Sequence, residues 1–226
     1  MEETMDIMQA MQERHAVRSY TEEPISQEAK DALQAKIDEV NRVGNLHVQM
    51  VCDEPKAFDG FMAHYGKFSG VTNYIAMIGP KGGDLSERVG YYGEELVLLA
   101  QQLGLNTCWV AMTFSKVKTA YELRDGEKLV VVISLGHGAT QGVAHKSKEA
   151  SAVSTVEGEA PAWFDKGIQA ALLAPTASNQ QVFHFTLKDD GIVEAKAGTG
   201  FYSHVDLGIA KLHFELGAGT ENFAWA

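Results

Sequence analysis

Two short segments carry side chains suited to binding an anion and a flat polar ring. Near the N-terminus, Arg14, His15 and Arg18 are close neighbours, and far along the chain residues 174–181 are small or amide-bearing. Guanidinium groups match phosphate oxygens, whereas amides donate and accept along the edge of a heterocycle. The two segments together indicate the ends of a site for a phosphorylated ring cofactor. Flavin mononucleotide (FMN) is the best candidate.

Composition restricts the class of protein. The chain has 226 residues, 45% of them hydrophobic, and a formal net charge of −11. Such an acidic chain is a poor partner for nucleic acid or for an anionic membrane surface. It also lacks a run of ~18 apolar residues that would cross a bilayer. We therefore expect one globular domain over residues 1–226, with sub-halves at 1–150 and 151–226.

Cysteine usage and the N-terminus indicate the compartment. The two cysteines, Cys52 and Cys108, form no disulfide framework, and the acidic N-terminus does not resemble a secretory signal. A reducing cytoplasm is the expected location. The histidines show no metal-ligand spacing, so no metal site is predicted.

Hydrophobic periodicity predicts loosely alternating helices and strands. Helices are expected at 4–13, 26–43, 88–103, 115–123, 160–174 and 201–216. Strands are expected at 46–52, 72–78, 107–111, 129–135, 182–187 and 192–196, the last two joined by a hairpin turn at 189–191. This order predicts an α+β fold with a mixed sheet and helices on both faces.

Several of these segments occur in the same order in one family. They are the cluster 14–18, the stretch 104–110 after the predicted helix 88–103, the strand and loop 133–138, and Ser178-Asn179-Gln180-Gln181. The chain resembles the FMN-dependent nitroreductase family over nearly its whole length, and is most similar to a branch with a Gln-Gln signature and a His213-Phe214-Glu215 stretch. The resemblance implies an FMN-containing oxidoreductase with a nitroreductase-like fold.

The resemblance also implies roles for individual residues. Arg14, within the pattern Arg14-His15-Ala16, would grip the FMN phosphate, and Arg18 would lie at the pyrimidine edge of the flavin. Lysines would add charge, with Lys146 and Lys148 at the phosphate and Lys67 pointing at the flavin. The face of the isoalloxazine would be passed by Thr107, Cys108, Trp109 and Val110.

The chain departs from the family pattern in two places. Ala16 stands where a serine is usual, and the small-polar-amide motif follows the helix 160–174 and not the helix 26–43. In ordinary members this motif reaches the flavin of a partner subunit. We hypothesise that Ser178, Asn179, Gln180 and Gln181 act in cis, so that the chain is either a monomer with pseudo-dimer character or a homodimer.

Each of these residues also has a plainer interpretation. Either arginine alone could complement a helix dipole, and residues 179–181 could equally cap a loop. Lys146 and Lys148 could be solvated, and Cys108 and Trp109 could belong to the core. The hydride chemistry of a flavin belongs to the cofactor, so no side chain is predicted to be catalytic.

The resulting hypothesis is an enzyme that passes hydride from NAD(P)H through FMN to a nitroaromatic, a quinone or a similar small organic acceptor. One alternative is an FMN-binding protein that does not turn over, such as a sensor or carrier. A third is a structural relative that binds no flavin.

Overall fold

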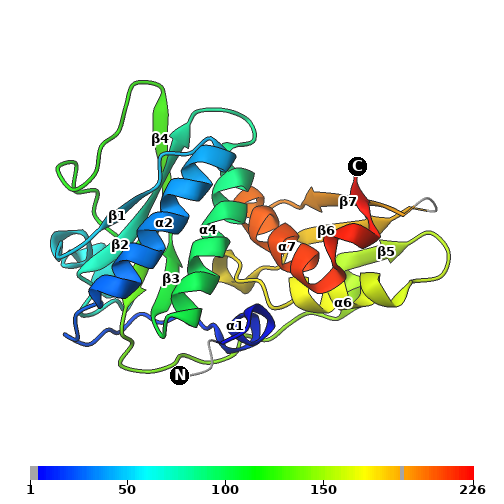
Figure 1. Cartoon of the computed structure of the whole chain (residues 1–226), viewed down its shortest axis with the longest axis horizontal. Coiled ribbons are helices and arrows are strands. Elements are labelled where there is room, and N and C mark those ends of the chain that lie inside the picture. Colours follow the sequence, from blue (N-terminus) through cyan, green and yellow to red (C-terminus); the bar gives the residue numbers. More distant parts are fainter. Residues whose placement is uncertain (1–4, 189–190) are drawn as a thin grey trace. The chain divides into compact units, whose positions relative to one another are not determined.

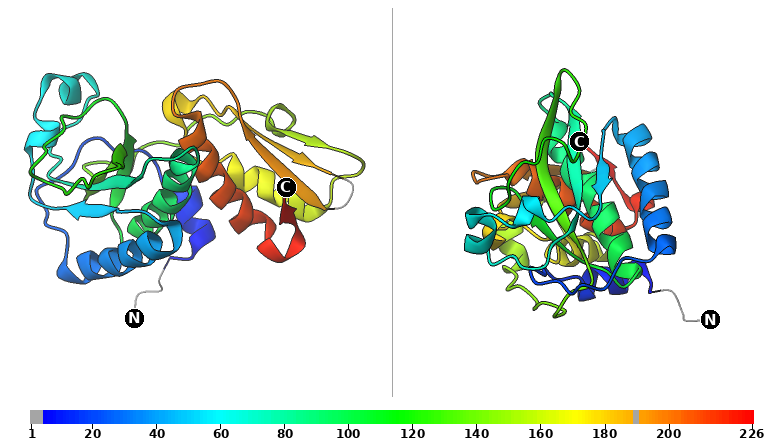
Figure 2. Two further views of the ribbon diagram at one scale, coloured as in Figure 1. Left: turned by 90° about the horizontal axis from the view of Figure 1, so that it is seen from above. Right: turned by 90° about the vertical axis from the view of Figure 1, so that its left-hand side faces the viewer.

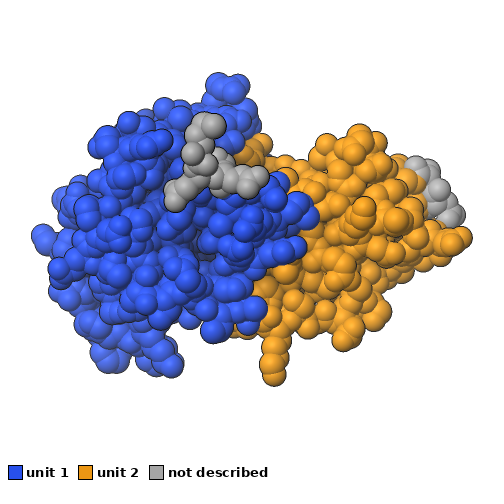
Figure 3. All heavy atoms as spheres, turned by 60° about the horizontal axis from the view of Figure 1, so that its bottom comes forward, with its two compact units in different colours: residues 1–85, 96–144 blue, residues 86–95, 145–226 orange. Residues whose placement is uncertain are grey.

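The computed structural model describes residues 5–188 and 191–226. Their contacts divide into two compact units, coloured separately in Figure 3. The first unit runs to Leu85 and continues from Leu96 to Ala144, and the second comprises Ser86–Glu95 and His145–Ala226. Each unit contains one sheet and its own helices, so the predicted α+β class is confirmed.

The first unit is built on an antiparallel sheet with the strand order β1-β2-β4-β3. Its strands are β1 (Gln49–Val51), β2 (Asn73–Pro80), β3 (Asn106–Val110) and β4 (Glu127–Gly136). Its helical elements are α1 (Ile7–Glu13), α2 (Gln27–Gly44), the 3-10 turn η1 (Lys56–Phe58), α3 (Phe61–Tyr65) and the later part of α4 (Leu85–Gln102). Figure 2 shows α2 on one face of this sheet and α3 on the other.

Sequence patterns explain the two best-defined elements of this unit. The apolar run of β4 lies between β2 and β3 and is buried over most of its length, as expected for a strand covered on both faces. Helix α2 begins where the Ser26 side chain accepts the Ala29 amide hydrogen, and ends at Asn45 in the left-handed conformation. It buries Leu33, Ile37 and Val40 along one stripe.

A buried tyrosine anchors the segment that follows α1. The Tyr20 hydroxyl donates to the Val17 carbonyl oxygen at 2.8 Å and pairs with the Ser134 hydroxyl of β4 at 2.8 Å. Burial raises the pKa of Tyr20 far above its usual value, so the hydroxyl remains a donor. This anchor fixes residues 14–20 in the unit that contains β3.

The second unit is built on a mixed sheet with the strand order β5-β6-β7-β8. The central strands β6 and β7 pair antiparallel, whereas both outer pairs are parallel. Its elements are α5 (Ala150–Val153), β5 (Ser154–Val156), α6 (Ala162–Ala171), η2 (Ala177–Asn179), β6 (Phe183–Leu187), β7 (Ile192–Ala197), α7 (Ser203–Ala218), η3 (Thr220–Asn222) and β8 (Ala224–Trp225). The predicted turn at 189–191 includes residues 189 and 190, which lie outside the described residues.

Two glycines let the first part of α4 approach α7 within this second unit. A Cβ atom on Gly90 would lie 2.0 Å from the Val205 carbonyl oxygen, and one on Gly208 would lie 2.0 Å from the Glu87 carbonyl oxygen. No side chain fits at either point, so the crossing in Figure 1 depends on both glycines.

The prediction of a helix over 115–123 is wrong. Between β3 and β4 the chain forms turns, and Phe114, Val117, Ala120 and Tyr121 pack against the core cluster of the first unit. Their helix-like spacing thus reflects contact with the core, and tertiary packing overrides local preference. The short elements α3, α5, β5 and β8 have no clear sequence pattern and were not predicted.

Candidate functional site

The N-terminal cluster lies along the outer edge of β3 in the first unit. Ala16 forms an isolated parallel bridge with Thr107, and the Val17 amide donates to the Thr107 carbonyl oxygen at 3.0 Å. On the other side, the Ser69 amide donates to the Arg18 carbonyl oxygen at 2.9 Å. The structure therefore brings together three segments that the sequence keeps far apart, namely 14–18, 67–69 and 107–110.

Both arginines of this cluster influence the pKa of the same thiol, that of Cys108. Arg14 is buried, with 4% of its surface exposed, whereas the Arg18 guanidinium lies 5.8 Å from the centre of the Phe68 ring. Burial raises the pKa of Cys108, and the charges of Arg18 and Arg14 partly oppose that rise. Two cations and Cys108 therefore share one region of the first unit.

The remaining predicted residues of this unit differ in exposure. Thr107, Cys108 and Val110 are buried, so their side chains are part of the core, and Trp109 is half-buried. Lys67 is exposed and adopts a left-handed backbone conformation directly after α3. His15 packs near the loop after β4, where a Cβ atom on Gly142 would lie 2.8 Å from the His15 Cβ.

In the second unit, two further predicted segments form one hydrogen-bonded loop. The Gln181 side-chain oxygen accepts the Lys148 amide hydrogen at 2.9 Å, and the Lys148 Nζ donates to the Gln181 carbonyl oxygen at 3.0 Å. The carbonyl oxygen of Lys146 accepts from Asn179 Nδ2 and from Gln181 Nε2, both at 2.9 Å. The basic segment and the amide segment are therefore held against each other.

The amides of this loop are largely used by the protein itself. Gln181 is only 2% exposed, and its Nε2 donates to the Asn179 Oδ1 as well as to Lys146. Gln180 Nε2 donates to the Phe201 carbonyl oxygen and to Asp206 Oδ2, both at 2.7 Å. Ser178 is exposed, and its hydroxyl makes no hydrogen bond within the described residues. The sequence interpretation of a capped loop therefore describes Gln180 and Gln181 well, and Ser178 and Asn179 remain accessible.

Sequence reasoning missed Asp206, which holds this loop. Asp206 is 3% exposed in the first turn of α7, where it accepts the Ala177 amide hydrogen at 3.0 Å and the Gln180 side chain. Burial raises the pKa of Asp206 to about 6, although both hydrogen bonds oppose the rise. No local sequence signal links this aspartate to a loop so far upstream.

The loop also has an unusual backbone. Ser178, Asn179 and Gln181 all have positive φ angles. Such angles are disfavoured for non-glycine residues and persist where surrounding contacts over-determine them. Here the hydrogen bonds with Asp206 and Lys148 hold the loop in this conformation.

Candidate metal clusters and membrane-spanning helices are both absent from the described residues. These residues contain no group of three or more His, Cys, Asp or Glu side chains that could hold a metal ion. No helix among them combines the length and apolar character needed to span a bilayer.

Comparison with known proteins decides the family. The family model described as "Putative TM nitroreductase" matches residues 6–218. The chain belongs to this nitroreductase family. The resemblance noted from the sequence is thereby confirmed.

Solved structures agree with this family assignment at the level of the fold. A "putative nitroreductase" of Thermotoga maritima is 22% identical, with a TM-score of 0.66 over 96% of this chain and 85% of its own. A "putative nitroreductase in complex with FMN" from Desulfovibrio desulfuricans is 18% identical, with a TM-score of 0.51 over 69% and 98%. NfrA2 of B. megaterium is 15% identical, with a TM-score of 0.54 over 74% and 82%. Among curated proteins, none matches the chain.

Proposed function

We propose that this nitroreductase-family protein is an FMN-dependent oxidoreductase that passes hydride from NAD(P)H to a nitroaromatic, a quinone or a similar organic acceptor. The observation that carries the proposal is the pair Arg14 and Arg18 on the edge of β3, in a chain of net charge −11. Guanidinium groups form charge-assisted, geometrically matched hydrogen bonds with phosphate oxygens. The Desulfovibrio structure, which contains FMN, adds support from the same fold.

The two arginines would have different tasks. Arg14 is held rigidly by burial, which suits a residue that fixes the phosphate. Arg18 is exposed, with its guanidinium near the face of Phe68, which suits a cation beside a flat ring. There Arg18 would stabilise the negative charge that the pyrimidine ring gains on reduction, and would thereby raise the reduction potential.

The cofactor would supply the hydride chemistry when bound, and the protein would orient it and set its electrostatics. The neighbouring groups of the first unit are poor proton donors. Burial raises the pKa values of both Cys108 and Tyr20, so neither is ionised near neutral pH. We therefore propose no catalytic side chain.

An absorption spectrum of the purified protein tests the proposal, followed by anaerobic addition of NADPH and then NADH. Flavin bands that bleach support the oxidoreductase and identify the preferred nicotinamide. Bands that persist with both donors favour the FMN-binding protein without turnover. If FMN is added and the unbound cofactor is then removed, the absence of flavin bands from the protein would contradict any role for the cofactor.

Variants distinguish a specific contribution of each arginine to FMN binding from a general effect of removing positive charge. Arg14→Ala should lower the affinity for FMN at least tenfold, because a charged hydrogen bond to phosphate is lost. Arg18→Lys should retain binding but alter the reduction potential less than Arg18→Ala does. Arg42→Ala, on the exposed side of α2, is the matched control and should bind FMN as the wild type does. Light scattering identifies the monomer. The ratio of flavin to protein in that monomer, measured by absorption, tests whether one chain is enough to bind FMN.

A further inference from the structure

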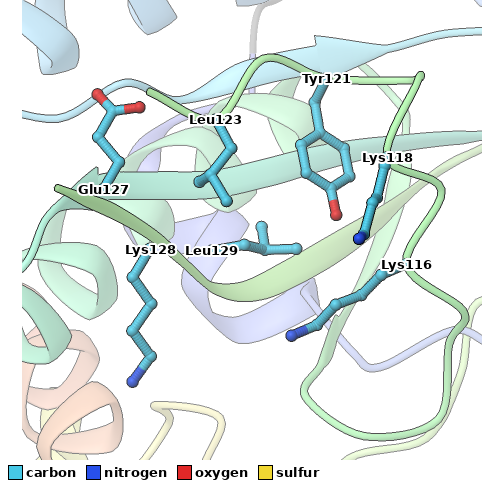
Figure 4. Close-up of a pocket in the computed structure, with 7 residues that line it drawn as sticks. All are labelled: Lys116, Lys118, Tyr121, Leu123, Glu127, Lys128 and Leu129. Carbon is cyan, nitrogen blue, oxygen red and sulfur yellow. The ribbon is translucent and has the colours of Figure 1, made fainter. Parts of the chain in front are cut away.

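A surface pocket of about 600 Å³ lies in the first unit, where the turns after β3 meet the start of β4 (Figure 4). Leu123, Leu129 and the ring of Tyr121 give it apolar walls. Lys116, Lys118 and Lys128 line it as well. Apolar surface beside several cations is a combination that recognises a small organic anion.

The three lysines concentrate positive charge at this pocket. Within the part of the chain that the structure describes, none of the three lysines forms an ion pair. Figure 4 shows the ammonium ends of Lys116 and Lys118 on the side of the Tyr121 hydroxyl, and Lys128 beyond Leu129. In a chain with a net charge of −11, such a local excess of positive charge marks a site for an anion.

Glu127 is the one acidic side chain that lines the pocket among the described residues, and it is engaged elsewhere. Its Oε2 lies 2.8 Å from His47 Nδ1 and accepts the Arg124 amide hydrogen at 2.9 Å. Burial acts to raise the pKa of Glu127, but His47 and the Arg124 amide outweigh burial and lower it. Figure 4 shows its carboxylate directed away from the three ammonium groups.

The wall that carries Leu123 is held in place from β1. The Gln49 side-chain oxygen accepts the Glu122 amide hydrogen at 2.8 Å, and Gln49 Nε2 donates to the Glu122 carbonyl oxygen at 2.8 Å. This reciprocal pair presents Leu123 with 52% of its surface exposed. A large apolar side chain fixed in an exposed position beside cations suits a ligand with an apolar body.

Tyr121 adds a hydrogen-bond donor to the pocket. Burial raises the pKa of its hydroxyl, which therefore keeps its hydrogen at neutral pH. Together with the two ammonium groups on its side, the hydroxyl can satisfy several oxygens of one group. A phosphate has more acceptor oxygens and more charge than a carboxylate, so it uses these donors more fully.

We propose that this pocket binds a small aryl phosphate ester. The aromatic ring of the ligand would lie on Leu123 and Leu129, and its phosphate between Lys116 and Lys118. The site belongs wholly to the first unit and uses none of the residues assigned to FMN. It therefore stands whether or not the proposed function is correct.

Titration of the full-length protein with phenyl phosphate, followed by calorimetry, tests the proposal. One saturable site is expected, with affinity that falls as salt is added. Combined Lys116→Ala and Lys118→Ala substitutions should weaken binding at least tenfold, whereas Lys56→Ala, an exposed lysine outside the pocket, should not. Equal binding by the wild type and the double variant would overturn the proposal.

Related probes separate the chemical classes. Inorganic phosphate should bind more weakly than phenyl phosphate, and Leu123→Ser should reduce that difference. Benzoate that binds as tightly as phenyl phosphate would overturn the choice of phosphate. Excess FMN should leave the affinity for phenyl phosphate unchanged, and displacement by FMN would contradict a separate site.

Discussion

Lys148 donates two hydrogen bonds to Gln181, one from its backbone amide and one from its side chain. The side chain of each residue bonds to the backbone of the other, at 2.9 Å and 3.0 Å. The relationship joins two segments that family resemblance treats as separate contributors to cofactor binding. Neither segment can therefore move or be altered without affecting the other.

This reciprocal pair predicts that Gln181→Ala destabilises the second unit. The substitution removes the acceptor for the Lys148 amide and a donor to the Lys146 carbonyl oxygen, at a position only 2% exposed. Each buried polar group left unsatisfied costs about 1–3 kcal/mol. Asn179→Ala, at an exposed position in the same loop, should cost less. Urea denaturation of both variants compares the costs, and equal losses would show that the buried amide has no special role.

Asp206 predicts a pH dependence of stability. Its pKa of about 6 lies above the ordinary 3.8, so between these values the folded state holds the proton more tightly than the unfolded state. Its contribution to the free energy of unfolding therefore falls as the pH rises through that window, by about 3 kcal/mol in total. Asp206→Asn removes this titration.

Urea denaturation at pH 4 and pH 7 measures the effect. The free energy of unfolding of the wild type, relative to Asp206→Asn, should be lower at pH 7 than at pH 4 by about 2–3 kcal/mol. Asp165→Asn, on the exposed side of α6, should show the same difference from the wild type at both pH values. A pH-independent difference for Asp206→Asn would contradict the raised pKa.

The two cysteines are free and should differ in reactivity. Burial raises the pKa of Cys108, which is 4% exposed, and burial also raises that of the more accessible Cys52. Since the thiolate is the reactive form, both thiols should alkylate slowly and Cys108 more slowly still. Mass spectrometry after iodoacetamide treatment at pH 8 ranks them. Faster labelling of Cys108 would show that Arg14 and Arg18 outweigh burial.

The sequence predicted those parts of the fold whose patterns depend on local burial. The apolar stripe of α2 reflects burial of one helix face, and the continuous apolar run of β4 reflects burial of both strand faces. Hydrophobic periodicity in the sequence reports both patterns. The segment 115–123 misled because its apolar residues contact a core assembled from distant strands. Short elements such as β8 depend on pairing with β7, which leaves no local signal.

The candidate site was predictable to a similar extent. Residue types made Arg14, Arg18 and the amide run candidates, but could not show that the Gln180 and Gln181 side chains donate to other groups of the protein. That outcome depends on Asp206 and on the carbonyl oxygen of Lys146, and both contacts join residues far apart in the sequence. The pocket at Lys116 and Lys118 likewise forms only once the turns fold back on β4.

A histidine and a glutamate form a fully buried pair in the second unit. His213 and Glu94 are both 0% exposed, with His213 Nε2 3.0 Å from Glu94 Oε1. His213 Nδ1 lies 3.2 Å from the Ala170 carbonyl oxygen, which can only accept, so this nitrogen carries a hydrogen. Nε2 is therefore the nitrogen left to hydrogen-bond with the Glu94 carboxyl group.

Removing the histidine leaves the buried glutamate without this partner. Breaking a buried pair in this way costs about 3–5 kcal/mol, so His213→Leu should destabilise the protein by that order. Glu94→Gln should cost less, because the amide can donate to Nε2 while Nδ1 keeps its bond to Ala170. His204→Leu, an exposed histidine on the same helix, is the control, and urea denaturation at pH 7 measures all three. A small cost for His213→Leu would mean that other groups around Glu94 satisfy the carboxyl group, and the contact with His213 would then have no structural role.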